Sequence, residues 1–254
     1  MAVVTALFPS HYITGEARPL TAQAIWSIAR DVRRQICSSL WAKPLTAEMM
    51  ISRVSVLVAN GIRFAPIWDC RNQVHDDEGR AVAGACEYDS DSPDNIYLSL
   101  NPNLIDGHPE LAASTAAHEL GHAIFDGPAS VISCRRITRH VIHDEMHFAT
   151  PPAKNEEYWS EYRANEFMGG LLAPPDLLHR SMVIRARVFG VALTNGQEHY
   201  GKPGYPVIDG QKWKRGEQGL LVDDLAAMFG VSAAFIWVRL QKYRLITTLE
   251  LGRK

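Results

Sequence analysis

The sequence predicts an α+β protein that is mainly helical, with a small β-sheet and a helical region at its C-terminus. Apolar residues recur at three- and four-residue spacing in several segments, as they do along one face of a helix. Two short extended segments, 81–88 and 96–100, flank a cluster of turn-forming residues and predict a β-hairpin. We expect one domain over residues 1–193, a loop or linker over 194–219, and a helix-turn-helix-like region over 220–254.

The composition is that of a folded protein with little net charge. The chain has 254 residues, of which 46% are hydrophobic, and its formal net charge is −2. This is enough apolar material for a large core, and too little charge to attract nucleic acid or an anionic membrane to the whole molecule. The N-terminus lacks the features of a signal peptide and no later segment is long enough to span a bilayer, so we expect a cytoplasmic protein. Four widely spaced cysteines indicate thiols and not a metal knuckle or a disulfide framework.

The first hundred residues predict scaffold elements. Apolar residues at core spacing predict a helix over 21–41 and a second helix over 46–60, which Gly61 would end. Residues 62–68 then alternate like a strand, which Pro66 would confine to a sheet edge or interrupt. The predicted hairpin follows, so these elements together predict a small sheet.

The segment His118-Glu119-Leu120-Gly121-His122 carries the strongest chemical signal in the chain. We predict that it lies in a helix that begins near Pro109 and ends at Gly127–Pro128. On such a helix His118 and His122 lie one turn apart on one face, so both imidazoles can bind one metal ion. Glu119 lies beside that face and can accept a proton from a metal-bound water. This H-E-x-x-H pattern is typical of zinc hydrolases.

A third ligand is needed, because a catalytic zinc usually takes three protein ligands and leaves a fourth position for water. The candidates are the acidic residues of the next predicted helix, which ends before Pro174: Glu156, Glu157, Glu161 and Glu166. Glu161 and Asn165 share one face of that helix, and Glu166 points about 140° away from Glu161. Glu161 is therefore the leading candidate, and Asn165 is placed to orient a ligand histidine. The spacing alone leaves the other acids open.

These motifs resemble those of the ImmA/IrrE metallopeptidases, whose pattern is HELGH, then E-x-x-A-N-x-F-A, then L-L-x-P. The matching positions are residues 118–122, then Glu161, Ala164, Asn165 and Phe167, then residues 171–174. The resemblance covers most of residues 45–246. It implies a zincin-like fold in which His118, His122 and Glu161 bind zinc, with manganese as the alternative metal. It also implies an endopeptidase of narrow specificity that cleaves a helix-turn-helix repressor and so controls stress or mobile-element genes.

The segment between His122 and Glu161 is longer than the family usually shows, which predicts an inserted loop. Within it, His143 and His147 have the spacing of a second ligand pair, but no third ligand accompanies them, so we expect surface residues or substrate contacts. The insert histidines, Tyr158, Tyr162 and His179 all remain candidates for stabilising the oxyanion that forms during hydrolysis.

The strand predicted over 96–100 comes just before the helix that carries the histidines. A peptide can add to an open strand edge and present its backbone to a nearby metal. We therefore predict that Ile96, Tyr97 and Leu98 contact the substrate, with an ordinary packed strand as the alternative.

The C-terminal region predicts a helix, a tight turn at Gly230 and a second helix capped by Ser232. This is the outline of a helix-turn-helix, and its second helix would offer Arg239, Lys242 and Arg244 to DNA. The outline is often just two packed helices, and a similar tail closes the ImmA/IrrE domains, so DNA binding is the minor expectation.

Two classes of function remain. The first is a zinc endopeptidase whose partner is a repressor. The alternative is a non-catalytic protein that binds DNA or a repressor and whose metal site is structural or vestigial. Glu119 favours the enzyme, because a structural site has no use for a carboxylate beside an open coordination position.

Overall fold

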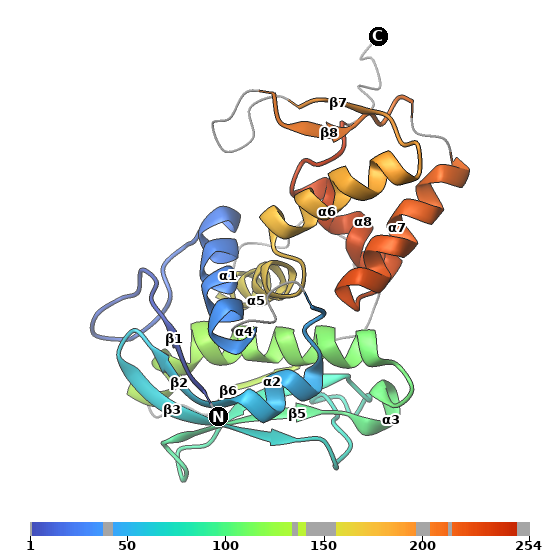
Figure 1. Cartoon of the computed structure of the whole chain (residues 1–254). Helices are drawn as coiled ribbons and strands as arrows, with labels where there is room; N and C mark the ends of the chain where they lie inside the picture. The colour runs from blue at the N-terminus through green and yellow to red at the C-terminus, as the bar shows by residue number, and fades with distance from the viewer. Residues whose placement is uncertain are drawn as a thin grey trace. The chain divides into compact units, whose positions relative to one another are not determined.

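The computed structural model describes residues 2–37, 43–133, 137–140, 156–196, 204–212 and 215–247. The described residues form a mixed α/β structure of eight helices and eight strands (Figure 1), which confirms the predicted combination of helices with a small sheet. The chain divides into two compact units, Met1–Trp41 with Leu45–Leu172 and Ala42–Pro44 with Ala173–Lys254. The boundary lies earlier than the predicted domain end at residue 193, because α6 (Pro175–Val188) packs against α7 (Arg215–Phe229).

A six-stranded mixed sheet, with strand order β1-β2-β3-β5-β4-β6, is the base of the first unit. Its strands are β1 (Ala2–Ala6), β2 (Val54–Ala59), β3 (Ile62–Asp69), β4 (Gly84–Tyr88), β5 (Asn95–Leu100) and β6 (Ile137–His140). The β1–β2 and β3–β5 pairs are parallel and the other neighbours are antiparallel. The predicted hairpin is confirmed: β4 and β5 pair with Tyr88 opposite Ile96 and Gly84 opposite Leu100.

Residues 96–100 do not form an open edge of the sheet, contrary to the prediction. β5 is an interior strand, paired with β3 on one side and with β4 on the other. Ile96 and Leu98 are buried and Tyr97 is half-buried. Because both backbone edges of β5 are already paired, Ile96, Tyr97 and Leu98 cannot accept a substrate as an added strand, and that prediction is corrected.

The helix predicted over 46–60 is wrong beyond Arg53. The structure has a short helix, α2 (Ala47–Arg53), capped by Thr46, and the chain then continues as β2. Three of the six residues of β2 are valines, and the strand pairs with β1 and β3 on either side. Pairing with two neighbouring strands therefore outweighs the apolar helical spacing of this segment.

Pro66 does not confine β3 to a sheet edge. The first part of β3, residues 62–64, pairs with β2, and residues 65–69 pair with β5. The Ala65 N–H donates to the Asp94 carbonyl on the β5 side, so the N–H that Pro66 lacks would point to the opposite side. Pairing with β2 has already ended there, and the sheet loses no hydrogen bond.

The helix that carries the histidines, α4 (Pro109–Ser133), packs on β4 and β5 and lies between the sheet and the helices α1 (Ala22–Cys37) and α5 (Glu156–Leu172) (Figure 1). The short α3 (Pro102–Ile105) leads into it. The predicted end at Gly127–Pro128 is wrong, because α4 continues to Ser133. A proline inside a helix costs about 3 kcal/mol, but Gly127 and Pro128 are both buried. A Cβ on Gly127 would lie 2.6 Å from the Ile96 Cδ1 atom, so close packing on the sheet keeps this stretch helical.

The second unit contains α6, α7, α8 (Ala233–Lys242) and an antiparallel pair of strands, β7 (Leu193–Asn195) and β8 (Pro206–Ile208). The described part of the predicted linker 194–219 therefore holds regular structure, which corrects that prediction. The helix-turn-helix outline is confirmed: Gly230 has a φ of 65°, and Ser232 caps α8 by accepting the Phe235 N–H. The two helices meet at 99°.

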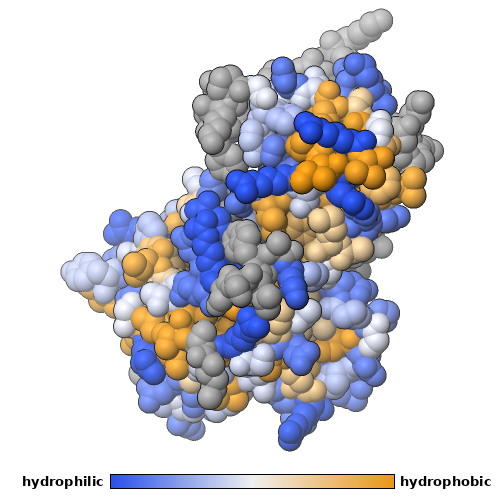
Figure 2. Space-filling view, viewed as in Figure 1, coloured by the Kyte–Doolittle hydropathy of each residue, from blue (hydrophilic) through white to orange (hydrophobic). Residues whose placement is uncertain are grey.

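Several large apolar side chains are exposed on α6, α7 and α8, namely Ile184, Val188, Leu220, Met228 and Trp237. Figure 2 shows orange, apolar surface over the helices of the second unit. No described helix is by itself long and apolar enough to cross a membrane, and α7 and α8 reach that criterion only when this bent pair is counted as one segment.

Candidate metal centre

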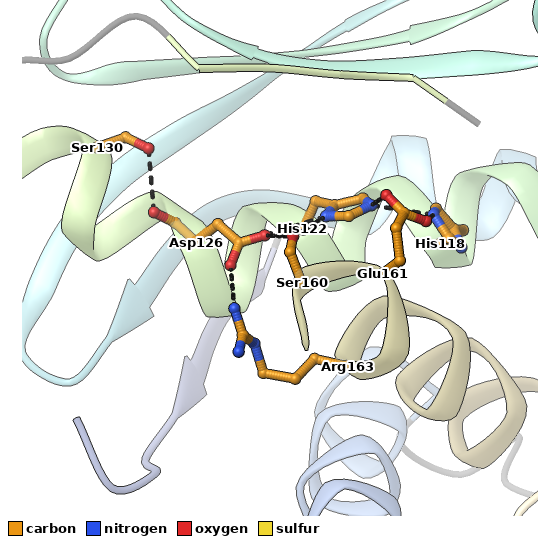
Figure 3. A network of polar contacts seen from close by, with 7 residues as sticks. All are labelled: His118, His122, Asp126, Ser130, Ser160, Glu161 and Arg163. Carbon is orange, nitrogen blue, oxygen red and sulfur yellow. Dashed lines mark hydrogen bonds and ion pairs between the residues drawn. The ribbon is translucent and has the colours of Figure 1, made fainter. Parts of the chain in front are cut away.

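Three side chains converge in the first unit as the sequence predicts: His118 and His122 of α4, and Glu161 of α5 (Figure 3). The two Nε2 atoms are 3.0 Å apart. Glu161 Oε1 lies 3.2 Å from the His122 Nε2 atom, and its Oε2 lies 3.4 Å from the His118 Nε2 atom. These atoms can therefore be ligands of a single metal ion.

The spacing of these atoms is that expected around one metal ion. Ligands bonded at about 2.0–2.1 Å in a tetrahedral arrangement lie about 3.3 Å from one another, and the three observed distances run from 3.0 to 3.4 Å. Two imidazoles and one carboxylate also leave a fourth position for a water or a substrate atom.

Small residues at the crossing of α4 and α5 bring the ligands together. A Cβ added to Gly121 would lie 3.0 Å from the Ala164 Cα atom and 3.2 Å from the Phe167 Cδ1 atom. The two helices could not approach this closely with larger side chains at these positions. Because Glu161 is one turn before Ala164 on α5, this approach carries its carboxylate to the histidines.

Helix α1 holds α5 in its orientation. Trp26 Nε1 donates to the Glu166 Oε2 atom at 2.7 Å, and Arg33 Nη1 donates to the Leu171 carbonyl at 2.8 Å, near the C-terminus of α5. Glu166 therefore faces α1, and Glu156 and Glu157 are exposed in the first turn of α5. Of the four acids that the sequence offered as a third ligand, the structure brings Glu161 to the histidines.

Glu119 is fully buried, and neither of its carboxylate oxygens has a hydrogen-bond partner among the described residues. Burial raises the pKa of Glu119 to about 8. Space for this carboxylate depends on Gly84 of β4, where a Cβ would lie 2.9 Å from the Glu119 Oε1 atom. A buried carboxylate without a partner is unfavourable, and a water bound to a metal at the three ligands would give it one. This fit supports a metal ion at the site.

The two histidines differ in their electrostatic surroundings. Burial lowers the pKa of His118, whose ring also hydrogen-bonds Asn165, the contact that the sequence predicts. Burial opposes a charge on His122 too, but hydrogen bonds with Asp126 and Glu161 raise its pKa to about 10. Positive charge at His122 is thus stabilised by two carboxylates, and the same carboxylates would stabilise a metal ion there.

The sequence did not predict Asp126, Ser160 and Arg163, which surround the Nδ1 side of His122. A signal was present, since Asp126 follows His122 by one helical turn and shares its face. Ser160 and Arg163 could not be recognised, because their roles depend on how α5 lies against α4.

The candidates for stabilising the oxyanion are dispersed. Tyr158 and Tyr162 form an aromatic cluster with Trp159 on α5. His179 belongs to the second unit, where its ring stacks on Tyr205 and its Nε2 lies 2.8 Å from the Pro206 carbonyl oxygen. The second predicted ligand pair, His143 and His147, lies outside the described residues.

A cavity of about 270 Å³ adjoins the site on the side of the Asp126–Arg163 pair. It is lined by residues of the N-terminal loop, α4 and the first turns of α5, and exposed Glu16 and Glu156 are among them. A wider hollow of about 740 Å³ lies at residues 102–109 and includes none of the three ligands.

Comparison of the chain with protein-family models, with curated proteins and with solved structures finds no match.

Proposed function

We propose that this protein is a zinc-dependent endopeptidase of the ImmA/IrrE type with a zincin-like catalytic unit. The observation that carries the proposal is the position of Glu119, a buried carboxylate that has no partner in the described part of the chain and lies next to three convergent ligands. A non-catalytic metal site gains nothing from a second, unpaired acid at this place.

A zinc ion held by His118, His122 and Glu161 would polarise the substrate carbonyl and lower the pKa of a bound water to about 7. Glu119 then accepts the proton of the attacking water on a carboxylate oxygen and delivers it to the leaving amine. Glu119 can accept this proton only in its deprotonated form, which a metal ion at the three ligands would favour over the protonated form that burial favours without it. The same residue therefore acts as general base and general acid.

The substrate we propose is a helix-turn-helix repressor, on the ground of the motif resemblance. The alternative, a DNA-binding regulator, gains little support from the C-terminal helices. Arg239, one of three basic residues predicted to face DNA, is buried, and its guanidinium lies 5.3 Å from the centre of the Phe235 ring. Lys242 is half-buried at the end of α8 and Arg244 is exposed just after it, whereas the exposed residues within the helix, Ala234, Trp237 and Gln241, add no positive charge.

The test is to load the protein with zinc and incubate it with the helix-turn-helix regulator encoded beside it, using wild type and Glu119→Gln in parallel. Mass spectrometry should detect one discrete pair of fragments with wild type, and intact regulator with the variant. Metal analysis of both proteins is the control, because Glu119→Gln should retain zinc. Cleavage by both proteins would refute the role of Glu119, and a stable complex without cleavage by either would favour the binding function.

A further inference from the structure

The ring of His122 is held from both sides (Figure 3). Its Nε2 atom faces Glu161 and His118, and its Nδ1 atom lies 3.0 Å from Asp126 Oδ2 and 3.1 Å from Ser160 Oγ. The Ser160 hydroxyl donates to the same Asp126 oxygen, and Arg163 Nη2 donates to the other, Oδ1, at 2.7 Å. One carboxylate thus connects a candidate metal ligand to a cation on a second helix.

We propose that Asp126 is a positioning residue of the metal centre that fixes the tautomer and the ring orientation of His122. The inference rests on the proposed metal-dependent function and extends it to a residue that does not touch the metal. With the proton on Nδ1 shared between Asp126 and Ser160, the neutral ring would offer the lone pair of Nε2 to a metal ion held with Glu161 and His118. A hydrogen bond from the distal ring nitrogen to a carboxylate orients a ligand histidine and makes it a stronger donor.

Arg163 fixes the carboxylate itself. Its side chain is 7% exposed and that of Asp126 is 13% exposed, so the pair lies almost entirely out of water. Each oxygen of Asp126 has a different partner, and the plane of the carboxylate is therefore set by two helices at once. Ser160 and Arg163 flank Glu161 on α5, so the helix that supplies the third ligand also orients the second.

A purely structural role for the Asp126–Arg163 pair would be to join α4 to α5. The two roles can be separated, because breaking a buried pair is costly whereas replacing both charges by neutral groups is often tolerated. Asp126→Asn leaves Arg163 unpaired and should lower the melting temperature of the metal-free protein. Asp126→Asn combined with Arg163→Met removes both charges and should recover most of that loss.

Zinc affinity distinguishes the two roles. It is measured by competition with a chromophoric chelator, alongside melting of the metal-free protein. If Asp126 acts through His122, the double variant still binds zinc about 10- to 100-fold more weakly than wild type, although its fold is restored. Arg163→Met alone keeps the carboxylate at His122 and should change zinc affinity less than the double variant does. Wild-type zinc affinity in the double variant would overturn the proposal.

A measurement on the wild-type protein covers the case in which the double variant does not fold. In the zinc-loaded protein, long-range ¹H–¹⁵N correlation spectra should show His122 bound to metal through Nε2 and protonated at Nδ1. Metal bound through Nδ1, or an unprotonated Nδ1, would overturn the proposal. None of these readouts depends on cleavage. A protein that binds zinc as described but cleaves nothing would refute the proposed function and leave the role of Asp126 standing.

Discussion

At the scale of single residues, the environment of Glu119 is suited to proton transfer and poorly suited to stabilising the fold. The side chain is fully buried, neither oxygen has a partner in the ranges that the structure describes, and burial raises its pKa to about 8. A structural acid at the same depth would be paired with a cation, as Asp126 is with Arg163. Burying a carboxylate in this way lowers the free energy of unfolding, so such a residue is expected where a function requires it.

This cost predicts a pH dependence for the metal-free protein. A carboxylate whose pKa is raised from 4.5 to about 8 on folding contributes stability that is fully present below pH 4.5 and is lost as pH rises through about 8. Glutamine does not ionise, so Glu119→Gln should not lose stability over this pH range. At pH 8–9 the free energy of unfolding of the metal-free variant should be higher than that of wild type by on the order of a few kcal/mol. The measurement is denaturant unfolding of both proteins in a chelator from pH 5 to 9.

His122 adds a second change of the same sign, because its pKa is raised from 6.5 to about 10 and its contribution is lost as pH rises through about 10. The charge on His122 also favours the ionised form of Glu119, so the two proteins are compared at pH 8–9, where the folded state of both keeps His122 protonated. Glu157→Gln, an exposed acid on α5, is the control. Stability curves of wild type and Glu119→Gln that stay parallel would contradict the account of Glu119.

Gly84 offers a prediction that is independent of charge. A Cβ at this position would lie 2.5 Å from the Thr115 Cγ2 atom, 2.9 Å from Glu119 Oε1 and 3.0 Å from the Ser99 carbonyl oxygen. Gly84→Ala should displace the Glu119 carboxylate and reduce the rate of cleavage by at least about 10-fold, with zinc retained. Gly219→Ala, which has open space around it, is the matched control. Under the proposed function, cleavage by Gly84→Ala at the wild-type rate would show that the position of Glu119 is not restricted by β4.

At the scale of elements, the crossing of α4 and α5 determines whether a three-ligand site exists. Gly121→Val should force the helices apart, because the new Cβ would lie 3.0 Å from a backbone atom of Ala164 that cannot rotate away. We expect a loss of about 1–3 kcal/mol in stability from overpacking and a weakening of zinc binding of at least about 10-fold. Calorimetric zinc titration checks this, with Gly219→Val as control. Unchanged zinc affinity would mean that Glu161 is not placed by the crossing.

The elements also show what could be predicted from the sequence. His118, Glu119 and His122 lie on one helix, so their geometry follows from the 3.6-residue period. Glu161 could be selected from its helical face and from the resemblance. The wrong predictions concern segments whose structure depends on residues far away in the sequence. β2 is a strand because β1 and β3 pair with it, and α4 continues past Pro128 because Gly127 packs on the sheet. The Asp126 network was missed for the same reason, since two of its members come from α5.

At the scale of the whole molecule, all three candidate ligands belong to the first unit and the helix-turn-helix outline belongs to the second. A metal that binds only the folded first unit stabilises that unit by mass action, by about 2.7 kcal/mol at a free concentration of 100 times its Kd. Hydrogen exchange followed by mass spectrometry can locate this effect. Amides of α4 and α5 that exchange by unfolding of the first unit should exchange about 100-fold more slowly in zinc than in a chelator.

The same experiment tests whether the two units unfold independently. Peptides from β7, β8 and α8 contain none of the three ligands, so we expect their exchange to be unchanged by zinc. Glu161→Ala is the control, because loss of one ligand should abolish the effect on α4 and α5. Equal slowing in both units would mean that they unfold as one cooperative body, and no slowing in α4 or α5 would mean that the three side chains do not hold a metal. Slowing limited to the first unit would assign metal-linked stability to the unit that carries Glu119 and leave the C-terminal helices energetically separate from it.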